Sequence, residues 1–184
     1  MFQKIVAVLL FSAIPSSGFA EWVGGVGLRT WSDVKGATLN TLAGSIGYQF
    51  GSQHKGLKFI PEFRYGIGIN DDVGNINDNP FISEDDDLDF EIDHFLILSV
   101  KGLYGFTNGA YIFGLIGWGD LHTEATLEDP RPDVMGTITT RSSDNAVGFG
   151  LGTGFRFNEL VVTELSLERY GEIDTLSLAL KFHF

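Results

Sequence analysis

The sequence predicts an all-β fold, an eight-stranded antiparallel up-and-down barrel, and three patterns carry this prediction. Large apolar residues alternate with small or polar ones, most clearly in 174–184, where Leu176, Leu178, Leu180, Phe182 and Phe184 take every second position. A strand turns alternate side chains to opposite faces, so one face of this segment is continuously apolar. The other two patterns are an alternation of short and long connections and a gathering of aromatic residues near the predicted strand ends.

The limited volume inside such a barrel indicates that it spans a membrane. Residues 145–157 place Val147, Phe149, Leu151 and Phe155 on one face, whereas glycines and Arg156 occupy the other. The interior of an eight-stranded barrel is only just wide enough for side chains, so it cannot hold the large face of every strand. The large face must point outward, and such a band is stable only against lipid.

The same alternation defines eight strands in chain order. Each is about the 9–11 residues that a tilted strand needs to cross the hydrocarbon core. The connections after the second, fourth and sixth strands are short, whereas 70–91 and about 121–145 are long, as in barrels with short periplasmic turns and long external loops. An even strand number puts both termini on the periplasmic side. Pro61 removes a ladder hydrogen bond, so we expect a bulge there or a later start of the third strand. The predicted strands are 22–30, 40–50, 57–69, 92–103, 110–120, 146–157, 161–169 and 174–184.

Aromatic residues near the strand ends predict two interfacial belts. The predicted belt near the long loops contains Trp31, Tyr65, Trp118 and Tyr170. The predicted belt near the short turns contains Tyr48, Phe50, Phe59, Tyr104, Phe106, Tyr111, Phe113, Phe155, Phe157, Phe182 and Phe184.

Residues 1–20 have the layout of a secretory signal peptide. Lys4 precedes an apolar run from Ile5 to Ile14, and small residues lead to a cleavage site after Ala20. The run is too short to span a bilayer as a helix. We therefore expect one domain, 21–184. Cysteine is absent, and 24 acidic against 12 basic residues argue against nucleic acid as a partner.

Three segments, 111–119 (YIFGLIGWG), 161–170 (VVTELSLERY) and 174–184 (DTLSLALKFHF), resemble the small OmpA-type outer-membrane β-barrel family. The resemblance implies a monomeric barrel in the bacterial outer membrane, in contact with lipid and lipopolysaccharide. It also implies that the C-terminal aromatic Phe184 is read by the barrel-assembly machinery. Two-domain members carry a peptidoglycan-binding domain after the barrel. The present sequence stops at the eighth strand, so cell-wall anchoring is not implied.

Charged residues at alternate positions are expected inside the barrel, where they must neutralise one another because an unpaired buried charge is costly. Pairing the last hairpins sets Glu164 opposite Ala179 and diagonal to Lys181 and Arg156, so we expect Glu164 to bridge those two cations. The cluster is interpreted as a polar plug, with a gate in a narrow pore as the alternative. The predicted lumen cluster is Arg29, Glu62, Arg64, Lys101, Arg156, Glu164, Glu168 and Lys181.

The external loops offer two weaker hypotheses. The acidic segment 70–91 contains nine acids and no base, and Asp85, Asp86, Asp87 and Asp89 are weak candidates for a divalent-cation site. The EF-hand spacing is not met, so a solvated loop without metal is the expectation.

His94 and His122, with Asp93, Asp120, Thr123 and Glu124, form the one candidate catalytic patch. We expect no enzyme and no cofactor. The predicted function is a structural or narrow-pore porin-like role in the outer membrane. A surface adhesin that binds a host is the alternative, and a barrel enzyme acting on lipid A or peptides is the second alternative.

Overall fold

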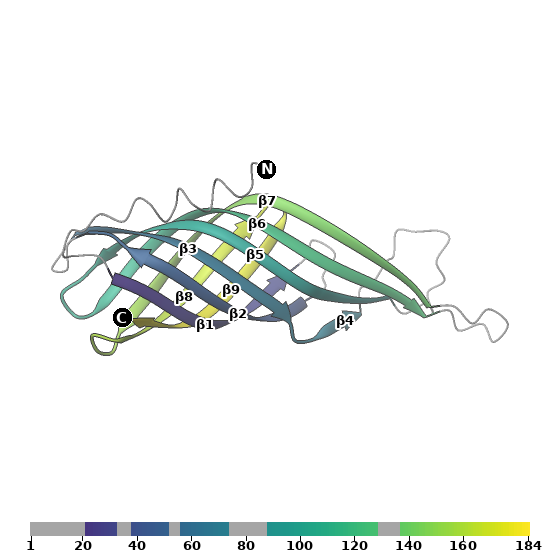
Figure 1. Cartoon of the computed structure of the whole chain (residues 1–184), viewed down its shortest axis with the longest axis horizontal. Helices are drawn as coiled ribbons and strands as arrows, with labels where there is room; N and C mark the ends of the chain where they lie inside the picture. The colour runs from purple at the N-terminus through teal and green to yellow at the C-terminus, as the bar shows by residue number, and fades with distance from the viewer. Residues whose placement is uncertain (1–20, 33–37, 52–55, 74–87, 129–136) are drawn as a thin grey trace.

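A closed antiparallel β-barrel is the architecture of this chain (Figure 1). The computed structural model describes residues 21–32, 38–51, 56–73, 88–128 and 137–184. The predicted signal peptide, 1–20, lies outside the described residues. Within the described ranges, no helix is long and apolar enough to cross a membrane.

Eight long strands form the wall, and one short strand lies beside it. The strands are β1 (Glu21–Ser32), β2 (Thr38–Gln49), β3 (Leu57–Gly68), β4 (Asp71–Val73), β5 (Leu88–Gly105), β6 (Ala110–Glu128), β7 (Thr137–Arg156), β8 (Val161–Tyr170) and β9 (Ile173–His183).

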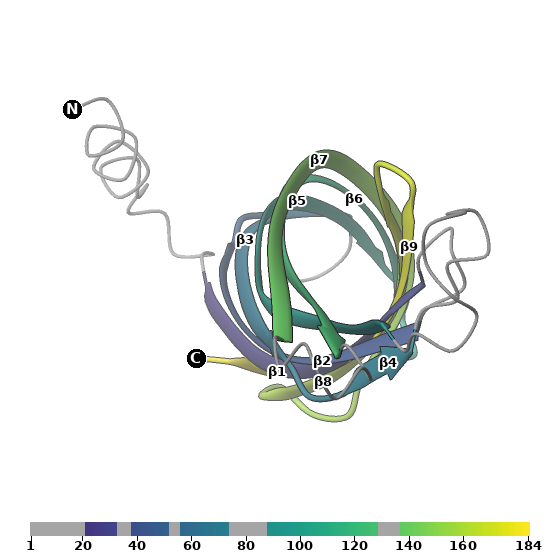
Figure 2. The same cartoon turned by 90° about the vertical axis from the view of Figure 1, so that its right-hand side faces the viewer.

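Closure of the barrel depends on two pairings beyond the sequential hairpins. β1 pairs with β9 as well as with β2, and β3 pairs with β5. The short β4 pairs only with the start of β5, so it adds to the rim rather than to the wall. Figure 2 shows the resulting ring from one end. The predicted eight-stranded up-and-down barrel is confirmed.

Pro61 interrupts a ladder without shifting it. β2 and β3 pair from Thr41↔Gly68 to Gly47↔Glu62, and the pairing resumes in the same register at Phe50↔Phe59. On its other side Pro61 lies opposite Val100 in an unbroken ladder with β5. The missing N–H therefore falls on the β2 side and leaves a local gap. The expectation of a bulge or a later strand start is wrong, because β3 begins at Leu57.

Three strands are much longer than the alternation indicates. β6 and β7 stay in one register from Ala110↔Phe155 to Glu128↔Thr137, whereas β8 pairs with β7 only from Gly148 onward. Much of the expected long loop, 121–145, is therefore strand that continues the barrel wall (Figure 1). In this extension β6 pairs with β7 on one side and, from Leu121 to Leu127, with β5 on the other. Residues 139–145 are exposed on both faces, which is why their alternation carries no apolar signal.

The outer face of the wall is apolar, as the volume argument requires. Leu151 is 73% exposed, and Phe149, Val147 and Leu167 are each more than 60% exposed. Gly148, Gly150, Gly152 and Gly154 turn to the inside on the same strand, since they alternate with these residues. A band of this kind fits a hydrocarbon environment.

The aromatic belts need a correction. Trp31, Tyr170, Tyr111 and Phe113 are buried inside the barrel, with 4–8% of their surface exposed. Glycines on β7 make room for them: a Cβ at Gly152 would clash with the ring of Phe113, and one at Gly154 with the ring of Tyr111.

Several of the other aromatic residues form edge-to-face pairs near the short turns. Their ring centroids lie 4.8–5.6 Å apart. The pairs are Trp22–Tyr48, Tyr48–Phe50, Tyr104–Phe106 and Phe155–Phe157.

Candidate functional site

The lumen is layered along the barrel axis. One buried apolar cluster, which includes Trp31, Phe95 and Tyr170, lies toward the projecting strands. A second, which includes Ile60, Tyr111 and Phe113, lies toward the short turns. A network of charged side chains contacts both clusters: Arg29 lies 5.3 Å from the ring centroid of Trp31, and Lys101 lies 5.1 Å from that of Phe113.

Glu168 on β8 organises one half of this network. Arg29 on β1 donates to both of its carboxylate oxygens at 3.1 Å, and Arg64 on β3 donates to them at 2.8 and 2.9 Å. Ser166 and Tyr170 donate further hydrogen bonds at 2.8 and 2.9 Å. A carboxylate with this many donors is well compensated despite its burial.

Glu62 on β3 organises the other half. Lys181 on β9 and Lys101 on β5 approach the Oε2 atom of Glu62 at 2.7 and 3.0 Å. Arg64 contacts the other carboxylate oxygen through Nε, which links the two halves into one network. Lys181 also donates to Ser45 at 2.8 Å.

Glu164 is held by partners that the sequence analysis did not assign to it. The predicted register is confirmed, because Glu164 lies opposite Ala179 and opposite Gly154. Its carboxylate, however, accepts from Lys101 at 2.6 Å and from the Tyr111 hydroxyl at 2.9 Å. The predicted bridge from Glu164 to Arg156 and Lys181 is therefore wrong.

The network closes the middle of the barrel. It joins four cations to three carboxylates, and the space left between them is a void of only about 20 Å³, enough for about one water molecule. Arg29 keeps two buried nitrogens, Nε and Nη1, without a hydrogen-bond partner among the described residues. Its guanidinium lies instead near the rings of Trp31 and Phe95, at 5.3 and 5.6 Å.

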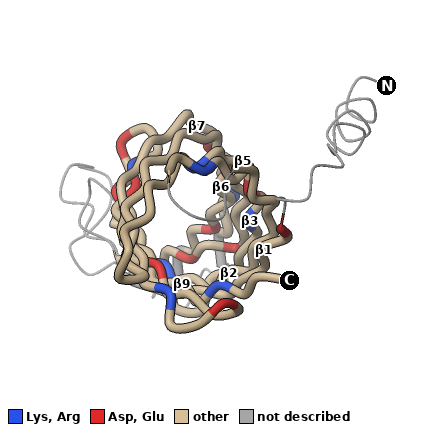
Figure 3. The backbone as a smooth tube through the Cα atoms, turned by 90° about the vertical axis from the view of Figure 1, so that its left-hand side faces the viewer, with Lys and Arg blue, Asp and Glu red and all other residues tan. Residues whose placement is uncertain are grey.

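Arg156 is the one predicted lumen residue that lies apart from this network. It lines a separate cavity of about 370 Å³ near the short turns, together with Lys58 and His183. Sequence analysis missed Lys58, although it precedes Glu62 and Arg64 at alternate positions of β3 and so shares their inward face. Figure 3 looks into the barrel from this end.

The histidine patch lies on the outer face of the wall. His94 and His122 stack with ring centroids 4.3 Å apart, and each contacts an aspartate, Asp93 or Asp120. Ser143 donates to Asp120 at 3.2 Å. The carboxylate thus lies between serine and histidine, whereas nucleophilic catalysis needs the histidine next to the serine.

The metal candidates fall largely outside the described residues. Asp85, Asp86 and Asp87 lie in 74–87, and the side chain of Asp89 at the start of β5 is not described. Within the described part of the chain, no group of three or more histidine or acidic side chains is placed to hold a metal ion.

Phe184 extends the last strand. Its backbone exchanges two hydrogen bonds with Trp22, at 3.0 and 3.1 Å, and its side chain is 69% exposed. The side chain therefore lies on the outer face at the end of the barrel, where another protein or lipid has access to it.

Known proteins share this fold at low sequence identity. No family model and no curated protein sequence matches the chain. The crystal structure of Ail, the attachment invasion locus protein of Yersinia pestis, is similar at 14% identity with a TM-score of 0.53, over 90% of this chain and 97% of that chain. A major outer membrane protein from Thermus thermophilus is similar at 12% identity with a TM-score of 0.56, over 90% of this chain and 99% of that chain.

These likenesses and the apolar outer face define a class. The chain shares the fold of these two outer-membrane β-barrels, with a closed wall of eight long strands around a lumen that contains charged side chains. Its lumen contains two distinct polar regions, the ion-paired network in the middle and the cavity near the short turns.

Proposed function

We propose that this protein is a structural barrel of the bacterial outer membrane whose lumen is plugged rather than conducting. The carrying observation is the buried network: each of Glu62, Glu164 and Glu168 is bonded to at least one cation and one further donor. Ions cannot pass without separating these pairs, and separating a buried pair costs about 3–5 kcal/mol. The void of about 20 Å³ between them has room for about one water molecule, which supports a closed lumen.

Conductance in a planar lipid bilayer tests the plug. We expect the wild-type protein to insert without steady openings. Glu164→Ala removes one partner each from Lys101 and Tyr111 and empties part of the lumen, so we expect small, flickering openings from this variant. Large, steady openings of the wild type would refute the plug and favour the narrow-pore porin-like role.

Interaction at the cell surface is the second candidate, and the projecting ends of β6 and β7 favour it. Residues 137–147 of β7 pair only with β6, and 139–145 expose polar side chains on both faces. A strand segment that is polar on both faces adds nothing to the membrane-spanning wall, whereas it offers a regular surface to an external partner. The name of the Yersinia pestis neighbour refers to attachment and invasion, but that likeness extends only to the fold.

A register-preserving deletion tests this candidate. Removing 125–128 together with 137–140 takes out strand segments that pair with each other and keeps the pairing of β5 with β6 from Phe95↔Leu121 to Glu91↔Glu124. Heat-modifiable gel migration shows whether the variant still folds. If the folded variant no longer binds host cells, the result favours the interaction role. Unchanged binding would argue against it.

The remaining assignments follow from the same proposal. The apolar wall contacts outer-membrane lipid and lipopolysaccharide, the barrel acts as a monomer with both termini periplasmic, and Phe184 is read by the assembly machinery. Deleting Phe184 should lower the folded fraction in the outer membrane while purified protein still folds in detergent. We also propose that the protein is not an enzyme, a view supported by the order of Ser143, Asp120 and His122 on the outer face.

A further inference from the structure

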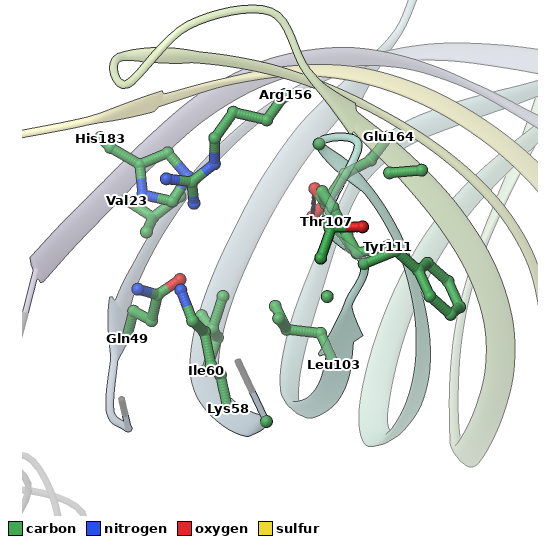
Figure 4. A pocket seen from close by; sticks show the side chains of 15 residues that line it. Val23, Gln49, Lys58, Ile60, Leu103, Thr107, Tyr111, Arg156, Glu164 and His183 are labelled. Carbon is green, nitrogen blue, oxygen red and sulfur yellow. Dashed lines mark hydrogen bonds between the residues drawn. The ribbon is translucent and has the colours of Figure 1, made fainter. Parts of the chain in front are cut away.

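The second polar region of the lumen is a cavity at the end of the barrel with the short turns. It has a volume of about 370 Å³, within the range of small-molecule sites. Figure 4 shows Arg156, His183, Lys58 and Gln49 around this space, with Tyr111 and Glu164 on another side. Inward-facing residues of the strands line the cavity together with residues of the short turns, among them Thr107 and Gly109.

Two cations in this cavity have no carboxylate bonded to them among the described residues. Lys58 is only 8% exposed, and Arg156 is partly buried. Neither side chain makes a hydrogen bond or ion pair with any described residue. Since a buried cation without compensation is costly, this arrangement is unusual for a site that serves stability alone.

The nearest carboxylates are already engaged. Glu164 is bonded to Lys101 and Tyr111, and Glu21 contacts Gln49 at 3.4 Å and His183 at 3.2 Å. Glu21 is near enough to Lys58 to attract it electrostatically, but neither carboxylate forms a hydrogen bond or ion pair with Lys58 or Arg156. The cavity therefore presents unmatched positive charge to whatever enters it.

Apolar side chains complete the lining. Val23, Ile60 and Leu103 are buried, with 2–7% of their surface exposed, and all three face the cavity. A ligand with an apolar part would replace water against them, which is favourable. The site thus combines two unmatched cations with an apolar wall.

We propose that this cavity binds a small soluble phosphate monoester whose organic part is apolar. A phosphate monoester carries a charge of about −1.5 to −2 at pH 7, which matches the two unmatched cations. The guanidinium of Arg156 is suited to bidentate contact with phosphate, and the ammonium of Lys58 adds a point charge. The organic group packs against Val23, Ile60 and Leu103.

Isothermal titration calorimetry with phenyl phosphate tests the site on the full mature protein in phospholipid-free detergent. We expect saturable binding, weaker binding of inorganic phosphate because it lacks the apolar group, and none of neutral benzyl alcohol. Lys58→Met and Arg156→Gln should each weaken phenyl phosphate binding by about tenfold or more, about 1.4 kcal/mol.

The matched control is Arg169→Gln, which removes the same charge from a half-exposed arginine paired with Asp174. Its affinity for phenyl phosphate should equal that of the wild type. Heat-modifiable gel migration establishes that each variant is folded.

The proposal is overturned by absence of saturable binding up to about 10 mM in folded wild-type protein, or by an equal loss of affinity in Arg169→Gln. Equal affinity for inorganic and phenyl phosphate would overturn the role of the apolar wall. A conducting wild-type channel would refute the plug but leave this binding result unaffected.

Discussion

The middle of the lumen and the cavity near the short turns are built from the same residue types but differ in how charge is compensated. In the middle, cations and carboxylates contact one another across a void of about 20 Å³. In the cavity, Lys58 and Arg156 face about 370 Å³ of space without a carboxylate partner among the described residues. The first region is complete within the protein and serves closure and stability. The second is electrostatically incomplete, which is the property of a site that takes a ligand.

Glu62→Gln should have the largest effect of the variants considered, because this carboxylate touches Arg64, Lys101 and Lys181 at once. The substitution keeps the shape but leaves three buried cations with less compensation. We expect the free energy of unfolding to fall by about 3–5 kcal/mol. Urea unfolding in lipid vesicles, followed by tryptophan fluorescence, measures the change.

The control for this variant is Glu124→Gln on the projecting part of β6, where Glu124 pairs with the exposed Arg141 at 3.0 Å. An exposed pair contributes about 0.2–1 kcal/mol. If Glu62→Gln lowered the free energy of unfolding no more than Glu124→Gln does, the buried network would not be a major source of the barrel's stability.

Two lysine substitutions compare the regions directly. Lys101→Met removes a cation bonded to Glu62 and Glu164, so stability should fall by about 3 kcal/mol. Lys58→Met removes a buried cation without such partners, so stability should stay constant or rise by about 1 kcal/mol. The same urea titrations give both values, and equal losses for the two variants would erase the distinction between network and cavity.

The interior location of these charges could be predicted from the sequence because strand periodicity alone decides which face a residue occupies. Arg29, Glu62, Arg64, Glu164 and Lys181 all lie inside as their alternate positions indicate. Lys58 carries the same signal and was missed because it stands near the predicted turn.

The ion-pair partners could not be predicted, since they cross the lumen. Lys101 on β5 reaches Glu164 on β8, and Arg29 on β1 reaches Glu168 on β8, although neither pair of strands is adjacent in the sheet. The register of a hairpin predicts only which residues of two adjacent strands lie opposite or diagonal to each other. Contacts across the barrel depend on the tilt and stagger of all eight strands together.

The alternation on β7 predicts only that its glycine face is small. In the structure these glycines leave the space that the rings of Tyr111, Phe113 and Tyr170 occupy. Gly152→Ala tests this difference, because its Cβ would clash with Phe113 and lie 2.6 Å from the backbone oxygen of Leu165. Overpacking of this kind should lower the free energy of unfolding by about 1–3 kcal/mol. Gly44→Ala is the outward-facing control: its Cβ meets nothing within 4 Å, so stability should hold or rise slightly. Equal effects at the two positions would mean that the interior packs loosely around its rings.

Tyr111→Phe should have the smallest effect, and it acts at the boundary between the two regions. The Tyr111 hydroxyl donates to Glu164 at 2.9 Å, and the same ring lines the cavity. Losing one hydrogen bond to a carboxylate that keeps Lys101 should cost about 1 kcal/mol in the urea titration. Glu164 would then have spare acceptor capacity facing the cavity, where it repels an entering phosphate, so phenyl phosphate should bind more weakly than to the wild type. A loss of stability with unchanged phosphate affinity would show that the two regions are independent. A loss of both would show that the plug also forms the inner wall of the anion site.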